Sequence, residues 1–89
     1  MIIKRKKRFI KSYIKLDRKI QDFFDKVYLK FIKNPLDPEL RNHALNWDYD
    51  WFRSIDVSWD FRAIFKECPK WTYEFVDFID IWTHSKLYW

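Results

Sequence analysis

The sequence predicts an α+β fold in which an N-terminal helical hairpin packs on one face of a small twisted antiparallel sheet. Two observations predict this fold. Apolar residues recur at intervals of three and four up to Asn34, which is the spacing of one helix face, and beyond Leu40 they alternate with polar residues as in strands. The chain has 89 residues, enough for one hydrophobic core and too few for two, so residues 1–89 are expected to form a single domain.

The N-terminal half predicts a short strand and two helices. Residues 2–4 contain two β-branched isoleucines, which favour a strand, and residues 6–16 have apolar side chains at helical spacing. Asp17 is a favourable N-cap for a second helix, and Asn34 and Pro35 end that helix. Both helices carry an aromatic stripe, which is typical of a face buried in the core.

Three strands are expected in the second half of the chain. Apolar and polar residues alternate over 51–58 and 61–66, and residues 73–82 are rich in aromatic and β-branched side chains. The connections at 58–60 and 67–70 are short. Neighbouring strands should therefore pair antiparallel, each with the next in the chain.

The composition indicates a soluble globular protein of the cytoplasm. Hydrophobic residues make up 48% of the chain, too many for a disordered tail, and no apolar stretch reaches the roughly 18 residues of a membrane span. The cleavage site of a signal peptide is not recognisable after the N-terminal charges. The single cysteine, Cys68, excludes an intramolecular disulfide and a cysteine-built metal cluster, and it agrees with a reducing compartment.

The net charge of +5 originates at the N-terminus. The first 16 residues contain seven basic side chains and no acidic one, whereas the remaining 73 carry 11 basic and 13 acidic side chains. Such a run is usually a solvated helix face, but it also suits the phosphates of ribosomal RNA. We expect Lys6, Lys7 and Lys11 to contact RNA in this way.

Polar side chains of the second half could form a ribonuclease site that needs no metal ion or other cofactor. The set contains two histidines, two aspartates and two arginines: His43, His84, Asp56, Asp60, Arg53 and Arg62. Cleavage of RNA by its own 2′-hydroxyl requires a base for that proton, an acid for the departing 5′-oxygen, and cations that stabilise the charged phosphate. The alternative is structural, because a histidine near a strand end often only caps the strand.

Three segments in order resemble a known family. They are Asn42-His43-Ala44-Leu45, RSIDVSWDFRAIF at 53–65 and FIDIWTHSKLY at 78–88. Together with the basic helical hairpin before them, they resemble the RelE/YafQ superfamily of bacterial type II toxins over the whole chain. The resemblance implies the RelE/ParE toxin fold and an mRNA interferase that enters the A site of the 70S ribosome and leaves a cyclic phosphate. It also implies a cognate antitoxin that inactivates the toxin in a hetero-oligomer.

The resemblance assigns roles to individual residues. His84 matches the family's catalytic histidine and is the leading candidate for the general acid. Asp60 matches the aspartate that acts beside it, as a base or by orienting the imidazole. Arg62 matches the arginine placed against the scissile phosphate; its alternative is a surface salt bridge with Asp56 or Glu67. His43 matches a further active-site histidine of YafQ-like members, and Tyr88 matches the aromatic that packs beside the substrate.

The sequence leaves alternatives for the roles of two residues and for the function of the protein. Arg53 matches a frequent family arginine that serves either the fold or a phosphate of the substrate. Asp56 is grouped with the substrate-binding residues, but it stands where some YafQ-like toxins have another histidine, so a three-histidine site is in doubt. The alternative functions are a ParE-like gyrase inhibitor, which shares the fold without the nuclease site, and an inactive relative that only binds antitoxin or RNA.

The chain contains six tryptophans and no glycine. The resemblance implies that glycine is common in the related toxins at all six positions, as in Asn46-Trp47 and Ser58-Trp59-Asp60; the six are Trp47, Trp51, Trp59, Trp71, Trp82 and Trp89. One hypothesis is that the gene reads the codon UGA as glycine and is translated here with tryptophan; the alternative is a protein that is genuinely rich in tryptophan. The hypothesis predicts that several of four tryptophans, Trp47, Trp59, Trp71 and Trp82, lie at turns or strand ends with positive φ or are unusually exposed.

Overall fold

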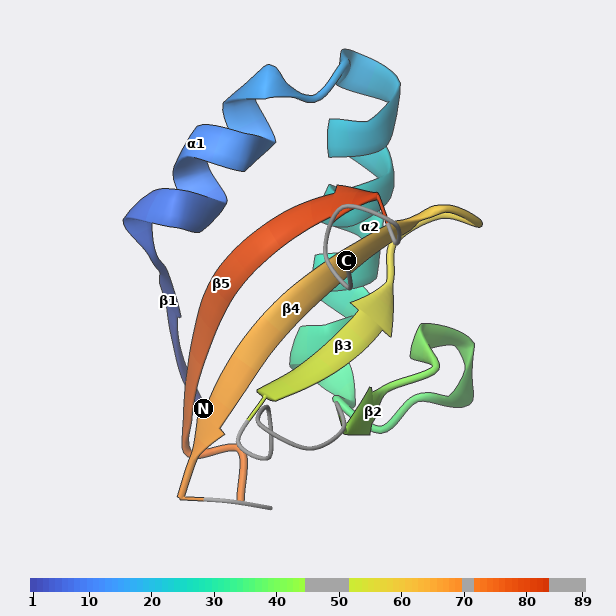
Figure 1. Cartoon of the computed structure of the whole chain (residues 1–89). Helices are drawn as coiled ribbons and strands as arrows, with labels where there is room; N and C mark the ends of the chain where they lie inside the picture. The colour runs from blue at the N-terminus through green and yellow to red at the C-terminus, as the bar shows by residue number, and fades with distance from the viewer. Residues whose placement is uncertain (45–51, 70–71, 84–89) are drawn as a thin grey trace.

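A computed structural model of the chain describes residues 1–44, 52–69 and 72–83. Its elements within these residues are β1 (Ile2–Arg5), α1 (Lys7–Lys15), α2 (Arg18–Lys33), the 3₁₀ turn η1 (Pro38–Leu40), β2 (His43–Ala44), β3 (Phe52–Asp56), β4 (Phe61–Cys68) and β5 (Phe75–Thr83) (Figure 1). The predicted fold class is confirmed, because a helical hairpin packs on a small sheet. The two-residue strand β2 was not predicted.

The sheet has the strand order β1-β5-β4-β3-β2 in the described part of the chain. Strands β2 to β5 pair antiparallel in sequence order. The pairings of β3 with β4 and of β4 with β5 agree with the short connections, whereas that of β2 with β3 was not predicted. Strand β1 instead lies parallel to β5, from Ile2 opposite Phe75 to Arg5 opposite Phe78. The sheet is therefore mixed, with a predicted antiparallel meander and one parallel strand at its edge.

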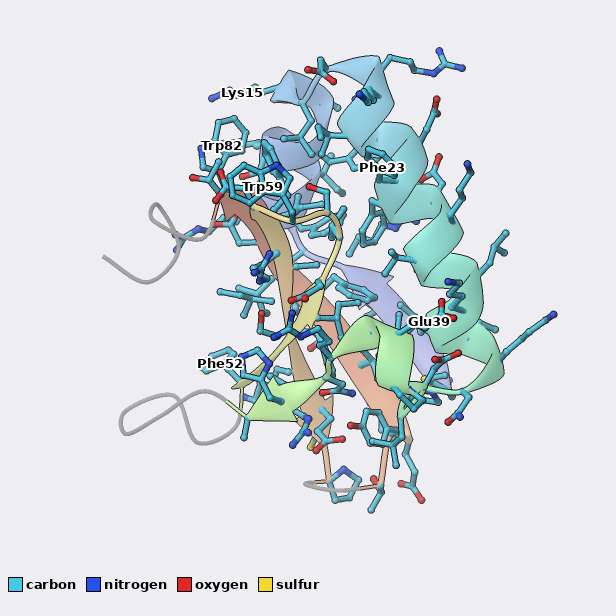
Figure 2. All side chains as sticks on the ribbon, turned by 90° about the vertical axis from the view of Figure 1, so that its right-hand side faces the viewer. Lys15, Phe23, Glu39, Phe52, Trp59 and Trp82 are labelled. Atoms are coloured by element: carbon cyan, nitrogen blue, oxygen red, sulfur yellow. The ribbon has the colours of Figure 1, made fainter. Side chains whose placement is uncertain are left out.

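The core between helices and sheet is built from phenylalanines. Phe9 of α1, Phe24 and Phe31 of α2, and Phe65 and Phe78 of the sheet are all 0% exposed. The ring centroid of Phe78 lies 5.5 Å from that of Phe31 and 5.6 Å from those of Phe9 and Phe24. Side chains fill the space between α2 and the sheet (Figure 2). The aromatic stripes are thus core, and burial of each such ring contributes about 1.5–3 kcal/mol.

Helix α2 begins and ends where the sequence predicts. The Asp17 side chain accepts a hydrogen bond from the Ile20 backbone N–H at 3.2 Å, which is the N-cap geometry, and Asn34 is the C-cap. Neither α1 nor α2, the two α-helices in the described residues, is long and apolar enough to span a membrane.

Helix α1 is fixed to β5 by a buried carboxylate. Asp80 is 7% exposed and accepts hydrogen bonds from Arg8 Nε at 2.8 Å and from Ser12 Oγ at 2.6 Å. The Arg5 guanidinium at the end of β1 lies over aromatic rings of both helices, at 4.8 Å from the Tyr28 centroid and 5.4 Å from that of Phe24. The basic helix is therefore held at the β1–β5 side of the sheet, opposite the edge formed by β2 (Figure 1).

Two tryptophans lie in the described residues, and they behave differently. Trp59 projects from the turn between β3 and β4 and is 91% exposed, as the recoding hypothesis predicts (Figure 2). Trp82 is half-buried and packs against the ring of Phe61 at a centroid distance of 6.4 Å. Neither has positive φ, because among the described residues only Arg41 and Tyr73 do. The exposure predicted for Trp59 is confirmed, whereas Trp47 and Trp71 lie outside the described residues.

Candidate functional site

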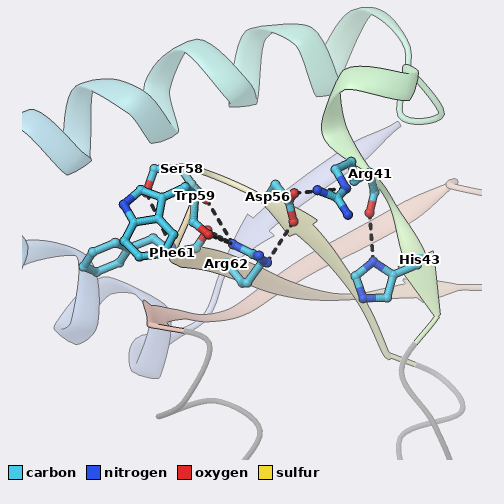
Figure 3. Close-up of polar contacts among 7 residues, drawn as sticks. All are labelled: Arg41, His43, Asp56, Ser58, Trp59, Phe61 and Arg62. Carbon is cyan, nitrogen blue, oxygen red and sulfur yellow. Dashed lines mark hydrogen bonds and ion pairs between the residues drawn. The ribbon is translucent and has the colours of Figure 1, made fainter.

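Polar residues line an open hollow of about 540 Å³ near the β2 edge of the sheet (Figure 3). The lining residues are Arg41, Asn42, His43, Asp56 and Arg62. Asp56 at the end of β3 lies directly opposite Arg62 at the start of β4, and the segment from η1 to β2 brings the other three beside them. Three members of the predicted site, His43, Asp56 and Arg62, thus lie together.

Arg62 is the most firmly held cation of the hollow. Its Nε lies 2.8 Å from Asp56 Oδ1, and its Nη1 donates to the carbonyls of Ser58 at 3.0 Å, Phe61 at 3.1 Å and Trp59 at 3.3 Å. Its side chain is only 16% exposed. Because Nε and Nη1 are engaged, Nη2 is the nitrogen for which the described residues provide no hydrogen bond, and it can donate to a ligand.

Asp56 bridges two arginines. Its Oδ1 binds Arg62, and its Oδ2 lies 3.5 Å from Nε of Arg41, whose side chain is 77% exposed. Two guanidinium groups and one carboxylate carry a net charge of +1. This arrangement leaves a cation at the hollow, and guanidinium groups are well matched to phosphate oxygens.

His43 is oriented by a backbone carbonyl. Its Nδ1 lies 2.8 Å from the carbonyl oxygen of Arg41. A carbonyl can only accept, so Nδ1 must carry the hydrogen of this bond. In the neutral ring, Nε2 then holds the free lone pair, and the exposed histidine can accept a proton from a ligand there.

Arg53 supports the site from inside the protein. Its side chain lies on β3, the residue is 8% exposed, and its Nε donates to Asn42 Oδ1 at 2.7 Å. Asn42 Nδ2 in turn donates to the Pro35 carbonyl at 2.8 Å and to the Tyr73 hydroxyl at 2.9 Å. Burial is the main cause that raises the pKa of Tyr73 above 10.0. These contacts fit the fold role for Arg53, because they anchor the segment that carries His43.

The remaining predicted residues lie apart from the hollow or outside the described residues. Asp60 is half-buried in the turn between β3 and β4, and within the described part of the chain its carboxylate has no hydrogen bond or ion pair. Lys6, Lys7 and Lys11 are exposed beside or on α1, across the sheet from β2. His84 and Tyr88 lie outside the described residues. The last described residue, Thr83, pairs with Phe61 beside the turn that contains Asp60.

The sequence missed Arg41. No local pattern marks it, because it follows a 3₁₀ turn and owes its place in the hollow to a left-handed backbone, with φ 51° and ψ 43°. The only available signal was its position next to the Asn42-His43 motif.

Among the comparisons with known proteins, only those with solved structures give matches. No protein-family model matches the chain, and no curated protein matches it. YafQ from E. coli superposes with a TM-score of 0.77 at 23% identity, covering 98% of this chain and 97% of that one. The E. coli DinJ–YafQ toxin–antitoxin complex gives 0.75 at 22% identity, covering 98% and 96%. A YoeB/ParE toxin from Agrobacterium tumefaciens gives 0.75 at 11% identity, covering 94% and 99%. The chain therefore has the fold of the YafQ and YoeB/ParE toxins.

Proposed function

We propose that the protein is the toxin of a type II toxin–antitoxin system, and that it cleaves mRNA on the ribosome by proton transfer through its own side chains. One observation carries the proposal. The arginine pair around Asp56 lies beside a histidine whose Nδ1 is bonded to a carbonyl, within a single open hollow. A cation and a proton acceptor side by side are what attack of a 2′-hydroxyl on its phosphate requires.

The proposed reaction needs a base, an acid and a cation. His43 Nε2 takes the proton of the 2′-hydroxyl, and the oxygen attacks the adjacent phosphorus. Arg62 stabilises the negative charge that develops on the phosphate oxygens. His84 protonates the departing 5′-oxygen, which leaves a 2′,3′-cyclic phosphate and a free 5′-hydroxyl. Asp60 orients the His84 ring or acts as the second candidate base.

The partners follow from the same proposal. YafQ has been solved in complex with DinJ, which supports a cognate antitoxin for this chain as well. The basic side chains of the α1 region suit contacts with ribosomal RNA, and Tyr88 would pack beside the message. A toxin that acts on ribosomes works in the cytoplasm.

The test is cleavage of mRNA in a translating bacterial extract, read by primer extension. His84→Gln and His43→Gln should each lower the cleavage rate about 10²- to 10⁴-fold, the usual effect of a general acid or base. Arg62→Gln should lower it about 10²- to 10³-fold, as the loss of a charge-stabilising donor does. The matched control is Arg18→Gln, because Arg18 is an exposed arginine of α2 paired only with Asp22 among the described residues. Intact mRNA with the unsubstituted protein would refute the nuclease proposal, and full cleavage by the His84 and Arg62 variants would refute the roles given to these two residues.

A ParE-like gyrase inhibitor is the second candidate, since the solved toxin from A. tumefaciens is described as YoeB/ParE. In that case the message should remain intact in the same extract while supercoiling of DNA by gyrase stops.

A further inference from the structure

Arg41 belongs to the arginine pair around Asp56, but the proposed reaction gives it no role of its own. It is the C-cap of η1, and its N–H donates to the Pro38 carbonyl at 3.2 Å. Its backbone lies in the left-handed region, which the β-carbon of most residues disfavours and which glycine or asparagine adopts more readily. An arginine held there against this preference suggests that the side chain is needed at this position.

The left-handed backbone directs the carbonyl group and the side chain of Arg41 to different partners. Its carbonyl oxygen faces the ring of His43 at 2.8 Å from Nδ1, while its side chain reaches across the hollow to Asp56 (Figure 3). A change of the backbone at this residue would move the carbonyl. A new side chain that tolerates the left-handed backbone would leave the carbonyl where it is.

The guanidinium of Arg41 is also less constrained than that of Arg62. Arg62 is 16% exposed, with an ion pair of 2.8 Å and three carbonyl contacts, whereas Arg41 is 77% exposed with an ion pair of 3.5 Å. The two groups bind opposite oxygens of one carboxylate, so both lie within reach of a single anion in the hollow. Arg62 is therefore a fixed cation, and Arg41 is one that can turn toward a ligand.

We propose that Arg41 has two separable roles. Its guanidinium is a second phosphate ligand beside Arg62, and its carbonyl holds His43 in the tautomer with the hydrogen on Nδ1. This inference rests on the proposed nuclease function and adds to it a phosphate ligand and a positioning residue.

Three substitutions separate the two roles. Arg41→Lys keeps the charge, Arg41→Asn removes the charge but tolerates the left-handed backbone, and Arg41→Val removes the charge and disfavours that backbone. The ring ¹⁵N chemical shifts of His43 in the free protein report the tautomer. The salt dependence of binding to a short single-stranded RNA with a 2′-deoxy nucleotide at the cleavage position reports the phosphate contacts.

We expect Arg41→Asn to make the slope of log K against log salt shallower by about 0.7, which is one phosphate contact on a single strand, with the ¹⁵N shifts unchanged. Arg41→Lys should change neither readout, and Arg41→Val should change both. An unchanged slope in Arg41→Asn would overturn the phosphate role, and unchanged ¹⁵N shifts in folded Arg41→Val would overturn the positioning role. If Arg41→Val does not fold, Arg41→Thr replaces it, since threonine is also β-branched and disfavours the left-handed region.

Both readouts use the uncleaved RNA or the free protein, so they are independent of the nuclease test. Intact mRNA in the translating extract together with the expected slopes and shifts would refute the nuclease but keep the assignment of Arg41. Cleaved mRNA together with unchanged slopes and shifts would keep the nuclease but refute the assignment of Arg41.

Discussion

Replacing Asp80 by asparagine should destabilise the packing of α1 on β5, although the two side chains have nearly the same size. The carboxylate is 7% exposed and accepts three hydrogen bonds, from Arg8 Nε, Ser12 Oγ and the Ile81 backbone N–H at 2.8 Å. The Arg8 side chain is 64% exposed, so its ion pair is screened and contributes at most about 1 kcal/mol. The other two bonds change from charged to neutral, which weakens each by about 1 kcal/mol. We expect a total loss of about 2–3 kcal/mol in the free energy of unfolding.

The assay is urea denaturation followed by circular dichroism. Asp80→Asn should lower the midpoint with an unchanged m-value, because the surface exposed on unfolding stays the same. The matched control is Asp77→Asn on the same strand, where the carboxylate is 31% exposed and lies 3.8 Å from Lys6 Nζ. That substitution should change the free energy by less than about 0.5 kcal/mol. If the two variants were equally stable, the buried carboxylate would not hold α1, and the reasoning would be wrong.

Two further predictions concern pH and salt. Because burial raises the pKa of Tyr73 above 10.0, the folded state keeps the phenolic proton longer than the unfolded chain does. The related stability is present below pH 10.0 and lost as the pH rises through the raised pKa, so Tyr73→Phe should flatten the alkaline decline in urea denaturation; an equally steep decline would contradict this. Changing Lys6, Lys7 and Lys11 to glutamate should weaken ribosome binding and make its salt dependence shallower, whereas an unchanged slope would assign these lysines to a solvated face.

Elements with local signals at both ends could be predicted from the sequence. Helix α2 is the best case, since Asp17 caps its first turn and Asn34 ends it. The pairing of β1 with β5 could not be predicted, because nothing in residues 2–5 indicates a partner near Phe75. Local patterns describe an element and its immediate neighbours in the chain, whereas a parallel pairing depends on the whole topology.

In the candidate site too, some residues could be predicted from the sequence and others could not. The resemblance selected His43 and Arg62, and the polar composition of the second half selected Asp56. The antiparallel pairing of β3 with β4 explains why Asp56 and Arg62 meet. In the alternation over 51–58, Arg53 falls on the same strand face as Ile55 and Val57, and the structure buries all three. Arg41 could not be predicted, because its contribution depends on one backbone conformation and on the direction of one carbonyl. No sequence pattern indicates either of them.

The pairing of the N-terminal strand with β5 has a consequence for folding during translation. Ile2 pairs with Phe75, and Arg8 reaches Asp80, 72 positions further along the chain. During translation the first strand and the basic helix therefore emerge long before their partner strand has been made. Contacts of such high sequence separation form late and slow folding. A chain with this topology can complete its fold only after β5 has left the ribosome that made it, and until then the basic segment lacks the strand on which it packs.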